Sequence, residues 1–232
     1  MPGLIANVVA VVIGGLLGLF IRGGLSVRFK SMVTNAIGLS CLFIGASGAF
    51  NGLLSGYSHP ILFILSLVIG GLFGEFIDLD ARIHWLGMFI ERRLGKEGFA
   101  KGFVTASLFF CVGSMAIIGS IEAALMGNYN VLFAKSALDG ITGVVLAASH
   151  GFGVIFAAVT VFVYQGLLFL LAGSVAPFMT ADAVRELSIV GGILIFAIGV
   201  DMLGIKRFKV ANFLPALFVP VVFYAIIERI AS

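Results

Sequence analysis

The residues best suited to chemistry are a lysine and an aspartate inside a strongly apolar stretch. Lys135 and Asp139 lie four positions apart within residues 131–149, so on a helix they share one face, a turn apart. Ionisable groups in such surroundings are costly and are by default candidates for an ion or proton pathway. Gly140 and Gly143 follow, and a helix that opens beside the carboxylate would suit a cation or proton site. The alternative is a static ion pair, or a Lys135 side chain that extends to the helix end.

Other polar residues extend this pair into a candidate path. Thr142 and Ser149 fall broadly on the same helical stripe, and Gln165 lies in the next apolar stretch. Glu122 ends the preceding stretch, where it would either close an outer vestibule with Lys135 or lie at the interface. The complete predicted path consists of Lys135, Asp139, Thr142, Ser149, Asn35, Asn212, Gln165 and Glu122.

The composition places these residues in a membrane. The chain has 232 residues, of which 61% are hydrophobic and 11% charged, against about 45–50% and about 25% in soluble domains. A soluble fold of this size could not bury so much apolar surface, so the bilayer must be its solvent. The composition excludes disordered, collagen-like, disulfide-rich and nucleic-acid-binding classes. Cys41 and Cys111 sit in apolar runs and are expected to be small buried hydrophobes.

Apolar stretches predict an all-α, polytopic transmembrane bundle that forms a single integral membrane domain over residues 1–232. A spanning helix needs about 20 mainly apolar residues. Residues 1–3 have no basic region of the signal-peptide type, so we expect the first helix to be retained. The connection 149–152 is very short, so helices five and six form a re-entrant or broken pair in the alternative, seven-span count. The eight expected spans are 4–21, 33–54, 60–77, 103–125, 131–149, 152–173, 187–203 and 210–227.

Loop charges predict the orientation. The loops 22–30, 78–101 and 201–209 hold most of the 14 lysines and arginines, whereas 55–59 and 126–130 hold none. With eight spans the three basic loops share one side, which the positive-inside rule assigns to the cytoplasm. We therefore expect a multi-pass protein of the bacterial cytoplasmic (inner) membrane with both termini outside.

One basic loop contains a predicted amphipathic helix at 79–97. Its apolar positions recur every three or four residues, and Trp85 widens the apolar face. Arg92, Arg93 and Lys96 are polar and are expected near anionic lipid headgroups at the cytoplasmic face. The helix is either an anchor that sets helix tilt or a regulatory lipid sensor. The apolar positions are Leu79, Ile83, Leu86, Ile90 and Leu94.

Internal repeats are a further signal. Residues 12–17 resemble 189–194, and 33–38 match 210–215 at the same offset, so helices one and two resemble a duplicate of helices seven and eight. Asn35 and Asn212 then occupy equivalent positions. Pro215 would break one helix beside them and Gly38 would loosen the other. The paired amides line a symmetric site or make interhelical hydrogen bonds.

A weaker match suggests an inverted repeat. Residues 30–38 resemble 135–143, which would set helices one to three against four to six, with a site at the midplane. Chance similarity between glycine-rich segments is the alternative. Glycines in small-x-x-x-small spacing predict close helix packing within the bundle or across an oligomer, and they favour a homodimer. These pairs are Gly14 and Gly18, Gly48 and Gly52, and Gly70 and Gly74.

Several of these segments together resemble a bacterial membrane family catalogued as domain of unknown function 554. The resemblance covers essentially the whole chain, and the Lys-Ser-x-Leu-Asp-Gly segment is fairly specific. It implies a bacterial inner-membrane protein and no established activity. Glu122 departs from the pattern, because a more variable residue is expected there. The segments are 3–7, 14–18, 34–38, 111–121, 134–142, 164–168 and 190–192.

Taken together, these features favour a small secondary transporter or exporter of an inorganic ion or small polar solute. The alternatives are a non-transporting assembly, sensory or lipid-binding module and, third, an ion channel. We do not expect an enzyme, since no nucleophile–base pair or metal cluster can be assembled. His59, His84 and His150 are isolated. We expect no cofactor or nucleic acid, and the lipid bilayer is the expected partner.

Overall fold

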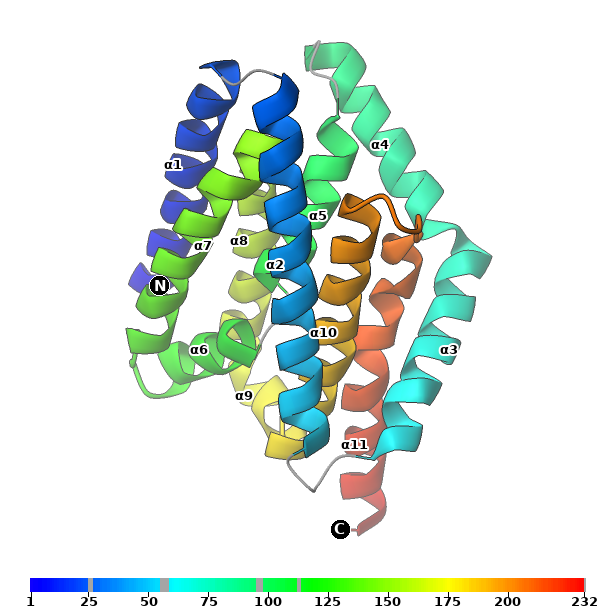
Figure 1. The fold of residues 1–232 in the computed structure, drawn as a ribbon. Helices are drawn as coiled ribbons and strands as arrows, with labels where there is room; N and C mark the ends of the chain where they lie inside the picture. The colour runs from blue at the N-terminus through cyan, green and yellow to red at the C-terminus, as the bar shows by residue number, and fades with distance from the viewer. Residues whose placement is uncertain (25–26, 55–58, 95–97, 112–113, 232) are drawn as a thin grey trace.

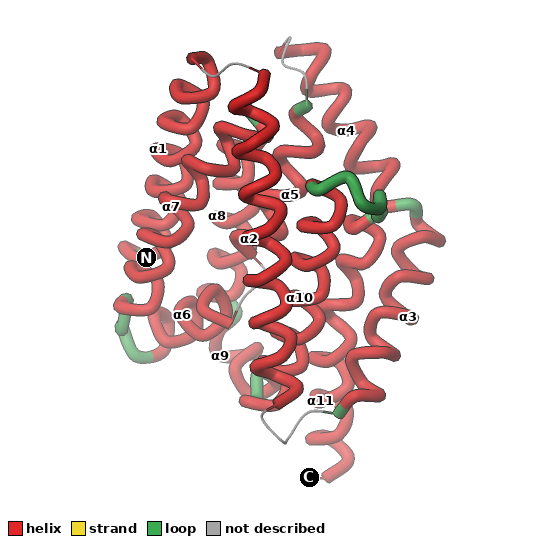
Figure 2. Tube along the Cα trace, in the orientation of Figure 1, coloured by secondary structure: helices red, strands yellow, loops and turns green. Residues whose placement is uncertain are grey.

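The computed structural model describes residues 1–24, 27–54, 59–94, 98–111 and 114–231. Over these residues the chain forms helices joined by short loops, with no strand (Figure 2). Seven of the helices are long and apolar enough to cross a membrane, or eight spans exist if one bent pair counts as a span. The predicted all-α membrane bundle is therefore confirmed. The helices are α1 (Pro2–Gly24), α2 (Val27–Leu54), α3 (Pro60–Ile77), α4 (Leu79–Leu94), α5 (Phe99–Cys111), α6 (Ser114–Leu125), α7 (Asn130–His150), α8 (Gly153–Leu170), α9 (Ala172–Val175), η1 (Ala176–Phe178), α10 (Ala181–Met202), η2 (Val210–Leu217) and α11 (Phe218–Ala231).

The bent pair corresponds to the expected span 103–125. It consists of α5 and α6, whose axes differ by 58°. The break considered between helices five and six is absent, because α7 and α8 are both long enough to span. Gly151 explains the short connection: its φ of +83° is readily available to glycine, which ends α7 and lets α8 begin two residues later.

The helices form two groups with α2 between them (Figure 1). Helices α1, α5, α7 and α8 pack together in one group, and α3, α10, η2 and α11 form the other. Helix α1 packs mainly on α7, and α2 packs mainly on α10. The ends of α1, α4 and α10 lie toward the upper part of the bundle, and the C-terminus lies at the bottom (Figure 1). These three helix ends adjoin the basic loops 22–30, 78–101 and 201–209, so their shared position agrees with the prediction that the basic loops lie on one side. Which side of the membrane this is stays a prediction.

The closest helix contacts are made through glycine. A Cβ atom on Gly14 would collide with the carbonyl oxygen of Gly140 on α7, and one on Gly74 would collide with the carbonyl oxygen of Asn212. Glycine permits these approaches because it has no side chain. The glycine pairs thus serve packing within one chain. The homodimer stays a prediction, and these glycines do not support it.

The two proposed hairpin copies differ in their second helix. Pro215 lies inside η2, a 3₁₀ helix of eight residues that precedes α11, as expected for a residue that removes a backbone donor. Helix α2 instead continues as an α-helix past Gly38, so the expected loosening there is wrong. Glycine keeps its N–H donor, and Gly38 packs closely against Leu203 and Gly199. The duplication itself, like the inverted repeat, stays a prediction.

The expected amphipathic helix is present as α4. Its Trp85, Met88 and Phe89 side chains are exposed, and the Trp85 ring stacks on Phe89 with centroids 6.0 Å apart. Arg92 and Arg93 are exposed on the same helix, and the Arg93 guanidinium lies 5.2 Å from the Phe89 ring centroid. The predicted interface residue Lys96 lies outside the described residues.

Candidate functional site

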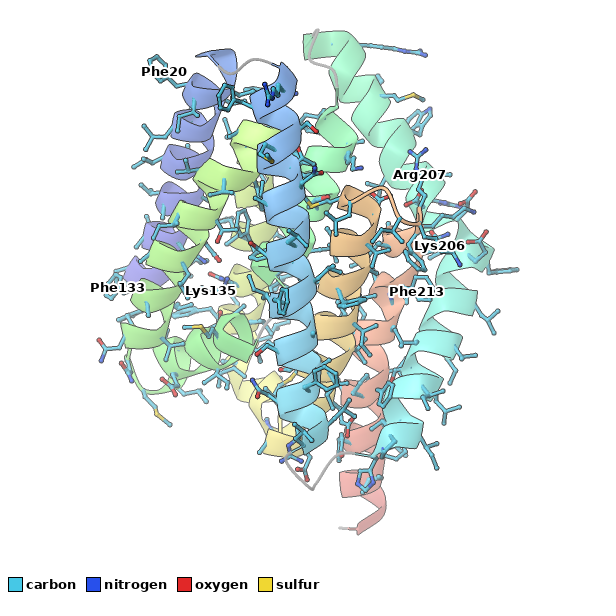
Figure 3. The ribbon with its side chains drawn as sticks, in the orientation of Figure 1. Phe20, Phe133, Lys135, Lys206, Arg207 and Phe213 are labelled. Atoms are coloured by element: carbon cyan, nitrogen blue, oxygen red, sulfur yellow. The ribbon has the colours of Figure 1, made fainter. Side chains whose placement is uncertain are left out.

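The predicted pair is formed inside the bundle. The Lys135 Nζ atom lies 2.6 Å from Asp139 Oδ2, and each side chain is only 7% exposed. Their spacing on α7 puts both on the face that packs against other helices. Two residues before Lys135, Phe133 points away from the bundle (Figure 3) and is 48% exposed. The ion pair therefore faces protein while its neighbour faces the surrounding medium.

A buried amide on α1 faces this pair. Asn7 is fully buried, and its side chain lies next to the Asp139 carboxylate. Close packing of α1 on α7 positions it, since Gly3 and Gly14 approach Leu132 and Gly140. Neither amide atom of Asn7 completes a hydrogen bond of good geometry with any residue that the structure describes.

A second amide lies on α8. Gln165 is 1% exposed, and neither its amide nitrogen nor its oxygen has a hydrogen-bond partner within the described ranges. At the next residue, Gly166, an added Cβ atom would lie 3.8 Å from Leu4, so this part of α8 faces the first turns of α1. The adjacent Tyr164 interacts with Cys111 of α5.

These residues define a buried polar layer, consisting of Asn7, Lys135, Asp139 and Gln165. Cys111, the last residue of α5, interacts electrostatically with both members of the ion pair, so the layer lies where the helix pair α5 and α6 is broken. It offers one cation, one carboxylate and two carboxamides. Each carboxamide can both donate and accept hydrogen bonds. Such a layer can bind a small ion or a small hydrogen-bonding solute.

The rest of the predicted stripe lies further along α7. Thr142 and Ser149 are both half-buried. The Ser149 hydroxyl lies 2.8 Å from the Thr34 hydroxyl of α2, and its backbone carbonyl accepts a hydrogen bond from Arg22 at 2.9 Å. Ser149 thus links three helices at the end of α7 opposite the ion pair.

The two asparagines expected to form a symmetric site are placed differently. Asn212 is buried, whereas Asn35 is exposed on α2. The Asn212 amide nitrogen donates to Glu75 Oε2 at 2.6 Å, and its oxygen accepts from the Asp80 backbone N–H at 2.6 Å. Asn212 therefore connects η2 with the junction of α3 and α4, and the structure gives it no common site with Asn35.

Lys209 completes that junction. Its ammonium donates to Glu75 Oε1 at 2.6 Å, in a pair that is more than half exposed. The hydrogen bond to Glu75 raises the pKa of Lys209 above its ordinary value. Each oxygen of the Glu75 carboxylate thus has a partner, unlike the amides of the buried polar layer.

Glu122 is placed apart from the ion pair. It is half-buried near the end of α6, and its Oε2 atom accepts a hydrogen bond from Asn128 at 3.3 Å. Lys135 is instead bonded to Asp139. The vestibule contact considered between Glu122 and Lys135 is not formed.

Sequence reasoning missed the buried amide of Asn7 and the buried carboxylate of Glu186. Asn7 gave only the weak signal of one amide in an apolar stretch. Glu186 is fully buried on α10, but the expected span began one residue later. The missed signal was Thr180, whose hydroxyl caps α10 by accepting from the Ala183 backbone N–H at 3.2 Å, so the helix begins six residues earlier than expected.

A helical bundle with seven or eight membrane-length helices around a buried polar layer defines a polytopic integral membrane protein. Within that class, the family described as "Protein of unknown function (DUF554)" matches residues 2–225, and the chain belongs to this family. The match includes every residue of the buried polar layer.

Two relatives are similar over most of their length. The "Uncharacterized membrane protein YdfK" of Bacillus subtilis (strain 168) is 39% identical over 209 residues, which cover 90% of this chain and 89% of the relative. The "Uncharacterized protein YqgA" of Escherichia coli (strain K12) is 30% identical over 209 residues, or 87% of each chain. No solved structure matches the chain.

Proposed function

We propose that this protein is a small secondary transporter or exporter of an inorganic ion or a small polar solute across the bacterial inner membrane. The observation that carries the proposal is the buried polar layer, which combines an ion pair with two buried amides that have no hydrogen bond of good geometry to any described residue. Asn7 and Gln165 are each at most 1% exposed.

The energetics argue against a purely structural layer. A buried polar group without a hydrogen bond costs about 1–3 kcal/mol, and a buried ion pair is often no more stabilising than apolar side chains of the same volume. A bundle selected only for stability would have apolar residues at these four positions. A solute that hydrogen bonds to Asn7 and Gln165 would offset the cost.

The broken helix supports the same proposal. Transporter sites lie where helices are discontinuous, because the backbone groups freed by the break can face a ligand. Here α5 ends at Cys111, which interacts electrostatically with Lys135 and Asp139. The break and the buried polar layer thus occur together, in the group of helices formed by α1, α5, α7 and α8.

The ion pair suggests how binding would proceed. A cation would take the place of Lys135 at Asp139, or an anion would take the place of Asp139 at Lys135. In either case the two amides would supply further contacts. The displaced Lys135 or Asp139 side chain would then need another partner. Binding would therefore be coupled to a rearrangement of α7 against α1.

Solid-supported-membrane electrophysiology on reconstituted protein tests the proposal. Jumps in cations, anions and pH should evoke a current that Asp139→Asn abolishes. Asp201→Asn is the matched control, since Asp201 is also an aspartate paired with a lysine, Lys101, at 2.9 Å but lies at the end of α10. Loss in the first variant alone supports the proposal, provided that thermal unfolding shows the reconstituted variant to be folded at the temperature of the recording.

Three other outcomes would contradict the proposal. A current that Asp139→Asn retains removes the ion pair from the path. A silent panel that is also negative in a radiotracer assay for electroneutral exchange overturns transport. Currents far above carrier turnover would indicate a channel.

A second candidate function, a lipid-binding or sensory module, is favoured by α4. Trp85, Met88, Phe89 and Arg92 line a shallow surface depression, which combines exposed apolar rings with a cation. This combination suits anionic lipid headgroups at the cytoplasmic face. Retention of phosphatidylglycerol over phosphatidylcholine in native mass spectrometry, lost in Trp85→Ala with Arg92→Ala, would support the module. Equal retention of both lipids would contradict it.

A further inference from the structure

A second buried carboxylate lies in the other group of helices. Glu186 on α10 has no exposed surface. Its Oε1 atom accepts a hydrogen bond from the His59 backbone N–H at 2.7 Å, at the N-terminus of α3. Its Oε2 atom is buried and has no hydrogen-bond partner among the described residues.

A buried tyrosine on α11 also has a hydroxyl without a hydrogen-bond partner among the described residues. This residue is Tyr224, which is 9% exposed. Tyr224 interacts electrostatically with Glu186 and packs in one apolar cluster with Leu62 of α3 and Ala183 of α10. Ala183 lies three residues before Glu186 on α10, so Tyr224 packs on the part of α10 that carries the buried carboxylate.

The surrounding charges are already engaged. On α10, Arg185 is paired with Asp182 at 2.7 Å. His59 precedes α3. On other helices packed against α10, Glu75 of α3 pairs with Lys209, Lys101 of α5 pairs with Asp201 and Glu122 of α6 bonds to Asn128, while Arg28 at the start of α2 is exposed. The His59 backbone N–H at the start of α3 offsets part of a negative charge on Glu186.

We propose that Glu186 and Tyr224 form a binding site for a single monovalent cation, either a proton or Na⁺, at the junction of α3, α10 and α11. A fully buried carboxylate is stable only when it is paired, bound to a cation or neutralised. The Glu186 oxygen that bonds to α3 fixes the carboxylate, and the other oxygen is left for the cation. Tyr224 supplies a second, neutral oxygen.

The site is separate from the buried polar layer. It lies where α3 and α10 begin, at the lower end of the second group of helices (Figure 1). Binding would hold α3 and α11 against α10, since the ligands come from two of these helices and the third is attached through His59.

Thermal unfolding of the purified full-length protein tests it. The melting temperature is measured in NaCl, KCl and choline chloride at constant ionic strength, between pH 5 and pH 9. Wild-type protein should be stabilised, in a saturable manner, either by Na⁺ or by a decrease in pH, and the response identifies which cation binds.

Two variants locate the response. Glu186→Gln retains an oxygen for the His59 N–H and removes the charge, so its melting temperature should no longer depend on the cation. Tyr224→Phe retains the ring and loses one oxygen, so half-saturation should shift about tenfold, the equivalent of one lost hydrogen bond. Asp201→Asn is the control, because it removes a carboxylate at the other end of α10 without removing either ligand.

Infrared spectroscopy makes the test independent of folding of the variants. A protonated carboxyl band near neutral pH, absent from Glu186→Gln, supports the proton. A carboxylate band that shifts when Na⁺ replaces choline supports Na⁺. If wild-type protein shows neither band, or if wild-type and Glu186→Gln respond equally to cations and pH, the site is overturned.

Discussion

Two lysine–carboxylate pairs of the same length occur in very different surroundings. The Nζ atoms of Lys135 and Lys209 each lie 2.6 Å from their carboxylate partners. The side chains of Lys135 and Asp139 are 7% exposed, whereas those of Lys209 and Glu75 are 55% and 58% exposed. The distance between the charged atoms therefore does not distinguish the two pairs, whereas the exposure of their side chains does.

The polar neighbours differ as well. Around Glu75 the hydrogen bonds are complete, because Asn212 donates to its second oxygen. In the buried polar layer they are incomplete, since Asn7 lies next to Asp139 without a hydrogen bond of good geometry and the Gln165 amide has no partner among the described residues. The exposed junction is satisfied by its own side chains, and the buried polar layer is not. This contrast is why we propose the layer as the binding site.

The largest expected effect is that of breaking the buried pair. Asp139→Asn leaves the Lys135 charge without a partner, which should lower the free energy of unfolding by about 3–5 kcal/mol. The double variant Lys135→Met with Asp139→Asn removes both charges and should recover most of that loss. Thermal unfolding in detergent measures both, and a double variant no more stable than the single one would contradict this account of the pair.

Separating α1 from α7 should have the next largest effect. Gly14→Ala adds a Cβ atom that would collide with the carbonyl oxygen of Gly140, so α1 must shift and carry Asn7 away from Asp139. Overpacking of this kind costs about 1–3 kcal/mol. Gly23→Ala is the matched control on the same helix, since a Cβ atom there meets nothing within 4 Å. Equal melting temperatures for the two variants would show that the close contact is unimportant.

Replacing an amide of the layer should stabilise the protein. Gln165→Leu substitutes an apolar side chain of similar size for a buried amide that has no described partner, so the free energy of unfolding should rise by about 1 kcal/mol. Chemical unfolding measured without added substrate gives the value. A loss of stability would mean that Gln165 contributes hydrogen bonds to the fold.

The exposed pair should give the smallest effect, with a characteristic pH range. Glu75 raises the pKa of Lys209 from its ordinary value of 10.5, so the stabilisation is complete below that value and is lost as the pH rises through the raised pKa. Solvent screens the pair and keeps the change small. Unfolding at pH 9 and pH 11 should show the loss in wild-type protein and not in Glu75→Gln. An equal pH response in both would exclude the pair as its cause.

The elements of the bundle could be predicted because span length and periodicity are local properties. The Lys135–Asp139 pair was predictable for the same reason, since a spacing of four residues fixes the helical face. Asn7 was not, because its role depends on the contact of α1 with α7. Glu186 was missed because hydropathy begins the span at Leu187, while the Thr180 cap begins the helix earlier.

Similar sequence also led to different environments. Asn35 and Asn212 occupy matching positions in the predicted repeat, but α2 leaves Asn35 exposed and η2 buries Asn212 against Glu75 and Asp80. Pro215 makes the difference in helix type, because it cannot donate the backbone hydrogen bond of an α-helix. Which helix each copy packs against is a tertiary property that the repeat alone could not specify.

The central claim, that the buried polar layer binds the transported solute, is tested most directly by the current of Gln165→Leu. Because this variant is expected to be at least as stable as wild-type protein, unfolding cannot explain a lost current. Solid-supported-membrane recordings should show that the substrate-evoked current of wild-type protein disappears in Gln165→Leu while the melting temperature is unchanged or higher. A wild-type current in this variant would contradict the claim and leave Gln165 outside the path.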